Sequence, residues 1–220
     1  MATEPEAVGR RAIAARRRQQ LLDTAARLFA DQGADSTSLE DIASEAGVTK
    51  GLLHYYFGSK AELLSAILQE SELRTRIERI PELTRDLPLE VTLPEVLARS
   101  MEVMRDRRDF VKLLFLEAAL SRPQAEAIYR ELIDVWVDNL AGIFVRAAAR
   151  GEIRLVDPRI AAQQVVDVLL ARFHWTEIAR RPSGPADTEA YMHQYADLLL
   201  RGLRPGKEEA RPTGKEGRRK

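Results

Sequence analysis

The sequence of 220 residues contains no cysteine, which excludes disulfide bonds, thiol catalysis and cysteine-ligated metal sites. Its three histidines, His54, His174 and His193, are far apart in the chain and have no cluster of carboxylates beside them. No metal site is therefore expected. A Ser-His-Asp arrangement, a phosphate-cradling glycine loop and a His-Glu helix motif are also missing, so the sequence predicts neither an enzyme nor a cofactor.

Long hydrophobic runs are absent as well. No apolar stretch is long enough to cross a bilayer, and none precedes Leu21 as a signal peptide would require. The chain is therefore expected in the cytoplasm, without a membrane partner. Charge of one sign is not in excess, because 34 Lys and Arg residues balance 34 Asp and Glu residues. A signal for nucleic-acid binding has to come from the local distribution of charge.

No segment alternates apolar and polar residues as a β-strand does, whereas signals for helix ends are frequent. Asp157-Pro158 is typical of a helix start. Capping-box spacing or a close variant occurs at Ser38 with Asp41, Ser59 with Glu62, Thr92 with Glu95, and Ser121 with Gln124. Glycines stand where helices should stop, at Gly33, Gly47, Gly58 and Gly151. These signals predict an all-α fold of about nine helices, over 17–31, 39–46, 50–57, 60–79, 94–105, 108–120, 123–150, 158–180 and 188–203.

Residues 36–57 have the pattern of a helix-turn-helix. One face of the first helix is apolar, and Gly47 permits the positive φ of a sharp turn. Apolar side chains can then anchor the second helix to the core while its other face stays free for the major groove. The buried set is predicted to be Leu39, Ile42, Ala43, Ala46, Leu53, Tyr56 and Phe57.

The free face of the second helix is predicted to carry Lys50, Gly51, His54 and Tyr55. Lys50 can donate to guanine O6 and N7, and His54 can reach a base edge or a phosphate. Gly51 lets the backbone come close to the groove. The alternative is a buried helical hairpin that does not bind DNA. It would not explain why Lys50, His54 and Tyr55 occupy the free face of the second helix.

The motifs of this region resemble the DNA-binding domain of the TetR family of bacterial transcription regulators over residues 18–68. They are Ala25-Ala-Arg-Leu-Phe29, Gly33, Thr37-Ser-Leu-Glu-Asp-Ile-Ala43, Ala46-Gly-Val-Thr-Lys-Gly51, Tyr56-Phe-Gly-Ser-Lys60 and Leu63-Leu64. The resemblance implies base reading by Lys50, Gly51 and His54. It implies phosphate contacts by Thr37, Ser38, Thr49, Tyr55, Tyr56 and Lys60. His54 replaces a frequent aromatic and Leu52 a frequent small hydroxyl residue, so the operator sequence does not follow; Leu52 can contact a thymine methyl or simply pack.

The rest of the chain has the layout of the family's C-terminal domain, with a long helix ending at Gly151, then Asp157-Pro158 and two last helices. This layout implies a homodimer formed through the last two helices and a pocket for a small-molecule effector among the middle helices. The candidate pocket residues are Met101, Met104, Phe115, Glu117, Trp136 and Phe173. Most of the apolar ones are expected to be ordinary core, with Trp136 the strongest pocket candidate, and Glu117 can equally face solvent.

The predicted organisation is a flexible basic arm (1–16), a DNA-binding domain (17–62), an effector-binding and dimerisation domain (63–204) and a disordered tail (205–220). Arginines 10, 11 and 16–18 either grip DNA or are simply solvated. The predicted function is a sequence-specific regulator, a repressor released from a near-palindromic double-stranded operator by an effector. The alternatives are an architectural DNA-binding protein without effector and a helical ligand-binding protein with a vestigial DNA domain.

Overall fold

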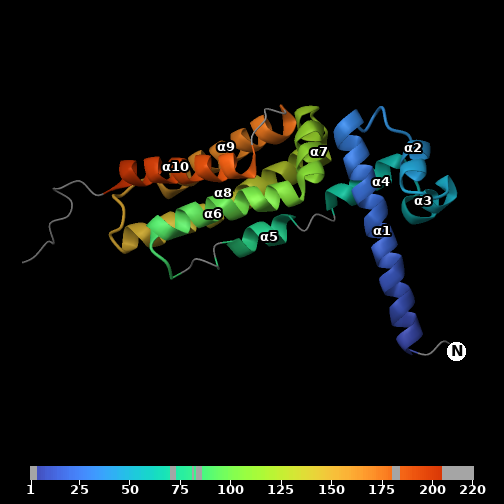
Figure 1. The fold of residues 1–220 in the computed structure, drawn as a ribbon, viewed down its shortest axis with the longest axis horizontal. Helices are drawn as coiled ribbons and strands as arrows, with labels where there is room; N and C mark the ends of the chain where they lie inside the picture. The colour runs from blue at the N-terminus through green and yellow to red at the C-terminus, as the bar shows by residue number, and fades with distance from the viewer. Residues whose placement is uncertain (1–3, 70–72, 81, 83–85, 180–183, 205–220) are drawn as a thin grey trace, which may run out of the picture. The chain divides into compact units, whose positions relative to one another are not determined.

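A computed structural model describes residues 4–69, 73–80, 82, 86–179 and 184–204 of the chain (Figure 1). Its regular elements are all helical, and no described residue belongs to a strand. The predicted all-α fold is therefore confirmed. The predicted disordered tail, 205–220, lies outside the described residues.

The helices follow one another closely along the chain. The first part holds α1 (Glu4–Gln32), α2 (Leu39–Glu45), α3 (Lys50–Phe57), α4 (Lys60–Gln69) and α5 (Leu73–Arg79). Then come α6 (Leu89–Asp106), α7 (Arg108–Ala119), α8 (Pro123–Ala149), α9 (Pro158–Phe173) with the π-helical turn η2 (His174–Ile178), and α10 (Pro185–Leu203).

The chain forms two compact units that interleave along the sequence. Residues 1–74 and 104–132 make up unit 1, and residues 75–103 and 133–220 make up unit 2. Helix α7 and the start of α8 thus belong with the helix-turn-helix. A division of the sequence at residue 62 does not show this, because the contacts concerned join residues far apart in the chain.

Unit 1 is built around the C-terminal half of α1, which contacts α2, α4 and α7. Figure 1 shows α2, α3 and α4 gathered beside this half of α1, and α2 and α4 each also contact α3. The contact face of α1 is the one that the sequence predicted, since Leu21, Leu22, Ala25, Leu28 and Phe29 are all buried. The helix-turn-helix therefore rests on a rigid apolar support.

Helix α1 corrects the predicted flexible arm. The helix begins at Glu4, whereas the sequence analysis placed its start near residue 17. Residues 11–16 are helical although every one of them is exposed. Local propensity accounts for this, because alanine and arginine are strong helix formers and Gly9 is the only weak one after Pro5. The predicted flexible arm is therefore wrong for residues 4–16, which are helical.

Unit 2 contains α6, α9, α10 and most of α8, with a core of aliphatic and aromatic side chains. Polar contacts tie its helix ends together. The Glu152 carboxylate after α8 accepts the backbone N–H of Leu89 at 2.7 Å, and the N–H of Arg154 donates to Leu203 O at 2.9 Å. Asp157 accepts from the N–H groups of Arg159 and Ile160, so the predicted cap of α9 is confirmed.

The cap of α6 by Glu152 explains a wrong prediction. Thr92 was expected to start this helix, but α6 begins at Leu89, and the Thr92 hydroxyl donates to Leu87 O at 3.2 Å inside the fold. The carboxylate that satisfies the first turn comes from a residue 63 positions away. A sequence pattern of four residues cannot reveal such a partner.

Three other predicted boundaries also differ. The segment 60–79 is not one helix, because α4 ends at Gln69 and α5 begins at Leu73. Ser121 does not start α8, which begins at Pro123; Ser121 instead adopts a positive φ of 56° in the turn. Helix α9 ends at Phe173, where the π-helical turn η2 replaces the predicted continuation.

Candidate nucleic-acid interface

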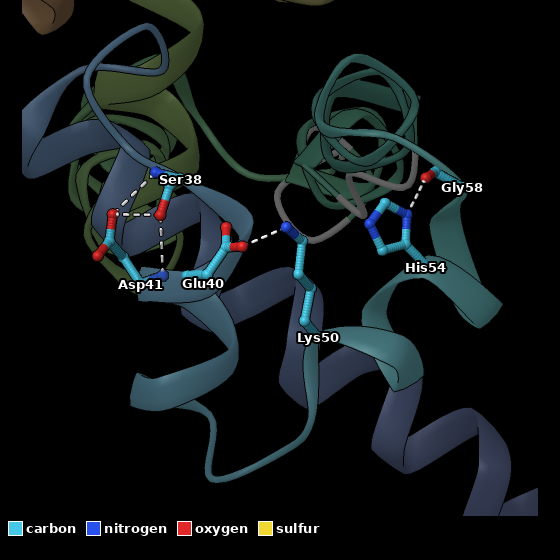
Figure 2. Close-up of polar contacts among 6 residues, drawn as sticks. All are labelled: Ser38, Glu40, Asp41, Lys50, His54 and Gly58. Atoms are coloured by element: carbon cyan, nitrogen blue, oxygen red, sulfur yellow. Dashed lines mark hydrogen bonds and ion pairs between the residues drawn. The ribbon is translucent and has the colours of Figure 1, made fainter.

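The helix-turn-helix is held by contacts within a short stretch of chain. Ser38 caps α2 in a reciprocal box with Asp41 (Figure 2): the Asp41 N–H donates to Ser38 Oγ at 3.1 Å, and the Ser38 N–H donates to Asp41 Oδ2 at 2.9 Å. The Ser38 hydroxyl also donates to this carboxylate, and together these bonds lower the pKa of Asp41. The predicted capping box is confirmed.

The turn between α2 and α3 is equally well defined. Gly47 has a φ of +65°, and the next N–H, of Val48, donates to Ala43 O at 2.9 Å. Thr49 then caps α3, because its Oγ1 accepts from the N–H of Leu52 at 3.3 Å. A side chain at position 47 would be strained in this left-handed conformation.

Helix α3 has one buried and one open face. Leu53 and Phe57 are buried against the core, as predicted, whereas Lys50, Gly51, His54 and Tyr55 are exposed. Tyr55 is 81% exposed, which is far more than a packing aromatic would be. The structure thus brings the predicted base-reading residues together on the accessible side of one short helix.

Lys50 forms an ion pair with Glu40 of α2 that the sequence analysis did not predict (Figure 2). The Lys50 ammonium donates to Glu40 Oε1 and lowers the pKa of this carboxyl. Both side chains are about half exposed, at 48% and 60%, and an ion pair so accessible to water contributes little free energy. DNA can therefore compete with Glu40 for Lys50.

His54 is held by the end of its own helix. Its Nδ1 bonds the carbonyl oxygen of Gly58 (Figure 2). A carbonyl can only accept, so Nδ1 carries the proton in this bond, and in the neutral ring Nε2 is left as an acceptor on this exposed residue. Such an acceptor matches the exocyclic amino groups of adenine or cytosine in the major groove.

Four of the predicted phosphate-contact residues are exposed or half-buried, although the Ser38 hydroxyl already donates its one proton to Asp41. Ser38 and Thr49 are exposed at the N-termini of α2 and α3, where backbone N–H groups also favour anions. Tyr55 is exposed and Tyr56 is half-buried, with their rings edge to face at 5.5 Å. Their positions are compatible with phosphate contacts around the open face of α3.

Thr37 and Lys60 do not fit the predicted phosphate role. Thr37 is 1% exposed, and its hydroxyl donates to Gly33 O at 2.9 Å. The Lys60 ammonium donates to the carbonyls of Ala34, Asp35 and Thr37 at 2.8, 3.1 and 3.1 Å. An ammonium has three protons, so these three bonds use all of its donors. The structure assigns Lys60 to the loop between α1 and α2.

Other contacts that position the interface were missed because they join separate helices. Arg27 of α1 forms an ion pair with Glu45 of α2. The guanidinium carbon of Arg18 lies 5.1 Å from the centre of the Phe57 ring, a cation–π distance. Both contacts tie the helix-turn-helix to α1. At least one of the N-terminal arginines thus has a structural contact.

The candidate effector-pocket residues are divided between the two units. Met104, Phe115 and Glu117 belong to unit 1, and Met101, Trp136 and Phe173 belong to unit 2. All but the half-buried Phe115 are buried, which is equally consistent with core packing. Glu117 is buried and does not face solvent, and it lines a cavity in unit 1.

Among the described residues of unit 2, the buried side-chain atoms without a hydrogen-bond partner include Ser100 Oγ and Trp136 Nε1. Ser100 was not among the predicted residues, and a serine among apolar residues gives no sequence signal of this kind. Within the described residues, no group of three or more histidine or carboxylate side chains is arranged to hold a metal ion. No helix in that part of the chain combines the length and apolar composition needed to span a membrane.

Comparison with known proteins yields matches over both parts of the chain. A family model described as "Bacterial regulatory proteins, tetR family" matches residues 21–67, and one described as "Tetracyclin repressor-like, C-terminal domain" matches residues 88–203. The HTH-type transcriptional repressor KstR2 of Mycolicibacterium smegmatis is 30% identical over 197 residues, which cover 86% of this chain and 91% of the relative.

Solved structures are similar over nearly the same length. The TetR family transcriptional regulator PfmR from Thermus thermophilus has a TM-score of 0.68 at 28% identity, covering 84% of this chain and 99% of PfmR. The ketosteroid transcriptional regulator KstR2 of Mycobacterium tuberculosis has a TM-score of 0.65 at 26% identity, covering 86% of this chain and 96% of KstR2. The likeness therefore extends well beyond the helix-turn-helix.

Proposed function

The chain belongs to the TetR family of bacterial regulatory proteins and is a DNA-binding transcriptional regulator, and we propose on that premise that it represses its target genes until a small molecule releases it. The observation that carries the proposal is α3, which is anchored by Leu53 and Phe57 and presents Lys50, His54 and Tyr55 outward. A rigid helix with one free polar face is what reading the major groove requires.

In this proposal the DNA-binding domain spans 17–62 and the effector-binding and dimerisation domain 63–204. The matched family models, over 21–67 and 88–203, support two such domains, with the first model extending five residues beyond residue 62. The protein acts as a homodimer through α9 and α10 and reads a near-palindromic operator, with half-sites one turn or a multiple of it apart. As a regulator of transcription it works where the bacterial chromosome lies, in the cytoplasm.

Replacing Lys50 by alanine tests the base-reading role. The operator is first identified by selecting bound fragments from genomic DNA. The variant should lose about 1–3 kcal/mol of specific binding, because a lysine that donates to a base edge discriminates by about that amount. Fluorescence anisotropy over the operator and its single-base variants should show that preference is relaxed at one base pair per half-site.

Glu40→Gln is the matched variant for this experiment. It removes the carboxylate that pairs with Lys50 and leaves the lysine in place. Because a negative charge is lost from the DNA-facing side, affinity for all sequences should rise while the base preference is kept. An equal loss on every sequence in Lys50→Ala would instead show that Lys50 touches only phosphate.

The proposed effector is a mainly apolar molecule with a hydrogen-bond acceptor, held in unit 2. The supporting observation is the pair of buried donors, Ser100 Oγ and Trp136 Nε1, that lack a protein partner. Buried donors without partners destabilise a fold unless a ligand or water satisfies them. The relative from M. tuberculosis is described as a ketosteroid regulator, and a ketone oxygen is an acceptor of the required kind.

A steroid ketone and the parent steroid hydrocarbon make a suitable pair of probes. The ketone should raise the melting temperature of the full chain and displace it from the operator. Ser100→Ala or Trp136→Phe should weaken ketone binding by about tenfold, as expected for one lost hydrogen bond of about 1.4 kcal/mol. Neither change should affect the hydrocarbon. Equal ketone affinity in both variants and the parent protein would exclude these donors as the anchor.

A further inference from the structure

A cavity of about 350 Å³ lies within unit 1, close to the helix-turn-helix. It is bounded by the loop between α1 and α2, by α4, and by the turn from α7 into α8. Its volume is at the lower end of the range for small-molecule sites. Asp35, Ala61 and Arg122 on its boundary are exposed, so a ligand can reach it from solvent.

One of the polar residues that line this cavity is Glu117, from the last turns of α7. The residue is only 5% exposed. Among the described residues no group donates a hydrogen bond to its carboxylate, and the closest cation, Arg122 Nε, is 3.9 Å from Oε2. Burial raises the pKa of Glu117, partly opposed by Arg122. A carboxylate so poorly satisfied is costly to keep in the fold.

The neighbouring cations are committed to other acceptors. Arg122 Nη2 donates to Asp35 Oδ2 at 2.9 Å. Lys60 uses its three donors on the backbone carbonyls of the loop between α1 and α2. The protein thus supplies Glu117 with a distant counter-charge but no donor. A ligand that brings its own charged N–H groups would complete the site, because charge-assisted hydrogen bonds are the strong ones.

Apart from Gln124, the remaining wall of the cavity is apolar. Leu64 and Leu68 contribute from α4, with Ala61, Pro123 and Ala125 beside them. We propose that this cavity binds a small amphiphilic amine, whose protonated nitrogen donates to Glu117 and whose hydrocarbon part lies against Leu64 and Leu68. A carboxylate ligand would be repelled by Glu117. A neutral alcohol would leave the buried charge uncompensated.

Occupation of the cavity should influence operator binding. Asp35 and Lys60 line the cavity and also hold the loop that leads directly into Ser38, the cap of α2. An amine that competes with Arg122 for Glu117 alters the contacts of Arg122 with Asp35, and so favours one arrangement of the loop over another. This effect of a bound amine on operator affinity rests on the proposed function, whereas amine binding itself does not.

Calorimetry on the full chain without DNA tests the binding site. Hexylamine, hexanol and hexanoate share the hydrocarbon and differ in the head group. Hexylamine should bind at least about tenfold more tightly than hexanol, the difference expected for one charge-assisted hydrogen bond, and hexanoate should not bind. Glu117→Gln should reduce hexylamine to the level of hexanol. Glu126→Gln, which removes a carboxylate outside the cavity, should bind like the parent protein.

Two further measurements keep the test decisive. Glu117→Gln should unfold at a higher temperature than the parent protein at pH 7, because the raised pKa of Glu117 means that stability falls as pH rises and the carboxyl ionises. The difference should shrink on acidification. Ala61→Leu, a change at an exposed helical position, should fill the cavity and weaken hexylamine binding.

Equal affinities for hexylamine and hexanol, or unchanged hexylamine binding in Glu117→Gln, would overturn the proposal. The effect on DNA binding is measured separately, as the change in operator affinity that hexylamine causes in the parent protein and in Glu117→Gln. Amine binding with no change in operator affinity would show that the cavity binds amines but does not regulate DNA binding. Loss of operator binding by Lys50→Ala concerns the proposed function and does not depend on this cavity.

Discussion

Lys60→Met will destabilise the protein by about 1–3 kcal/mol and weaken its binding to every DNA sequence, without changing how binding depends on salt. The substitution keeps the length of the side chain and removes the three N–H donors. The carbonyls of Ala34, Asp35 and Thr37 then lose their shared partner. Ala34 and Thr37 are buried, so water replaces the ammonium poorly. The loop that positions the cap of α2 then becomes less ordered, and α3 is held less firmly as a result.

Urea denaturation and anisotropy titrations at several salt concentrations measure the two effects. The sequence pattern alone assigns Lys60 to a phosphate, and a lost phosphate contact lowers the slope of log affinity against log salt by about one. Such a change in slope with unaltered stability would restore the phosphate role. Lys112→Met is the control for loss of a lysine charge, because Lys112 pairs with Asp31. It should leave the salt slope unchanged.

The helix-turn-helix was predictable because its determinants are local. Ser38 and Asp41 are three residues apart, Gly47 provides the turn, and the apolar spacing identifies the buried face. The same logic failed at α6, whose first turn is capped by Glu152 from beyond α8. It also failed at α1, where exposed residues are helical through propensity alone. Sequence patterns thus describe elements well when the stabilising partners lie within about one helix turn.

For the candidate site, residue types could be predicted but their partners could not. The sequence predicts that Lys50 and His54 lie on the free face of α3. It does not reveal that Glu40 bonds Lys50 or that the Gly58 carbonyl bonds His54. Lys60 is the clearest case, since a lysine at a helix start suits a phosphate and a carbonyl equally. In the C-terminal part, a buried Glu117 and an unpartnered Ser100 acquire meaning only from three-dimensional surroundings.

We expect Leu198→Glu to convert the protein from a dimer to a monomer. Operator affinity should fall by more than about a hundredfold, because a monomer binds one half-site without the second subunit on the other. Leu198 is 70% exposed on α10, and Ile160 is 61% exposed on α9. The inner faces of these helices are already filled, by residues such as Val165 and Ala196. Large apolar side chains on the outer faces are typical of a surface that another subunit covers.

Symmetry makes this substitution severe. In a twofold interface every contact occurs twice, so a single Leu198→Glu change buries two charges without partners. Sedimentation should show a monomer with unchanged helix content, and anisotropy should show only weak binding that is similar for all sequences. His193→Glu places the same charge on another side of α10 and should remain dimeric. A dimer of normal stability in Leu198→Glu would mean that a different surface joins the subunits.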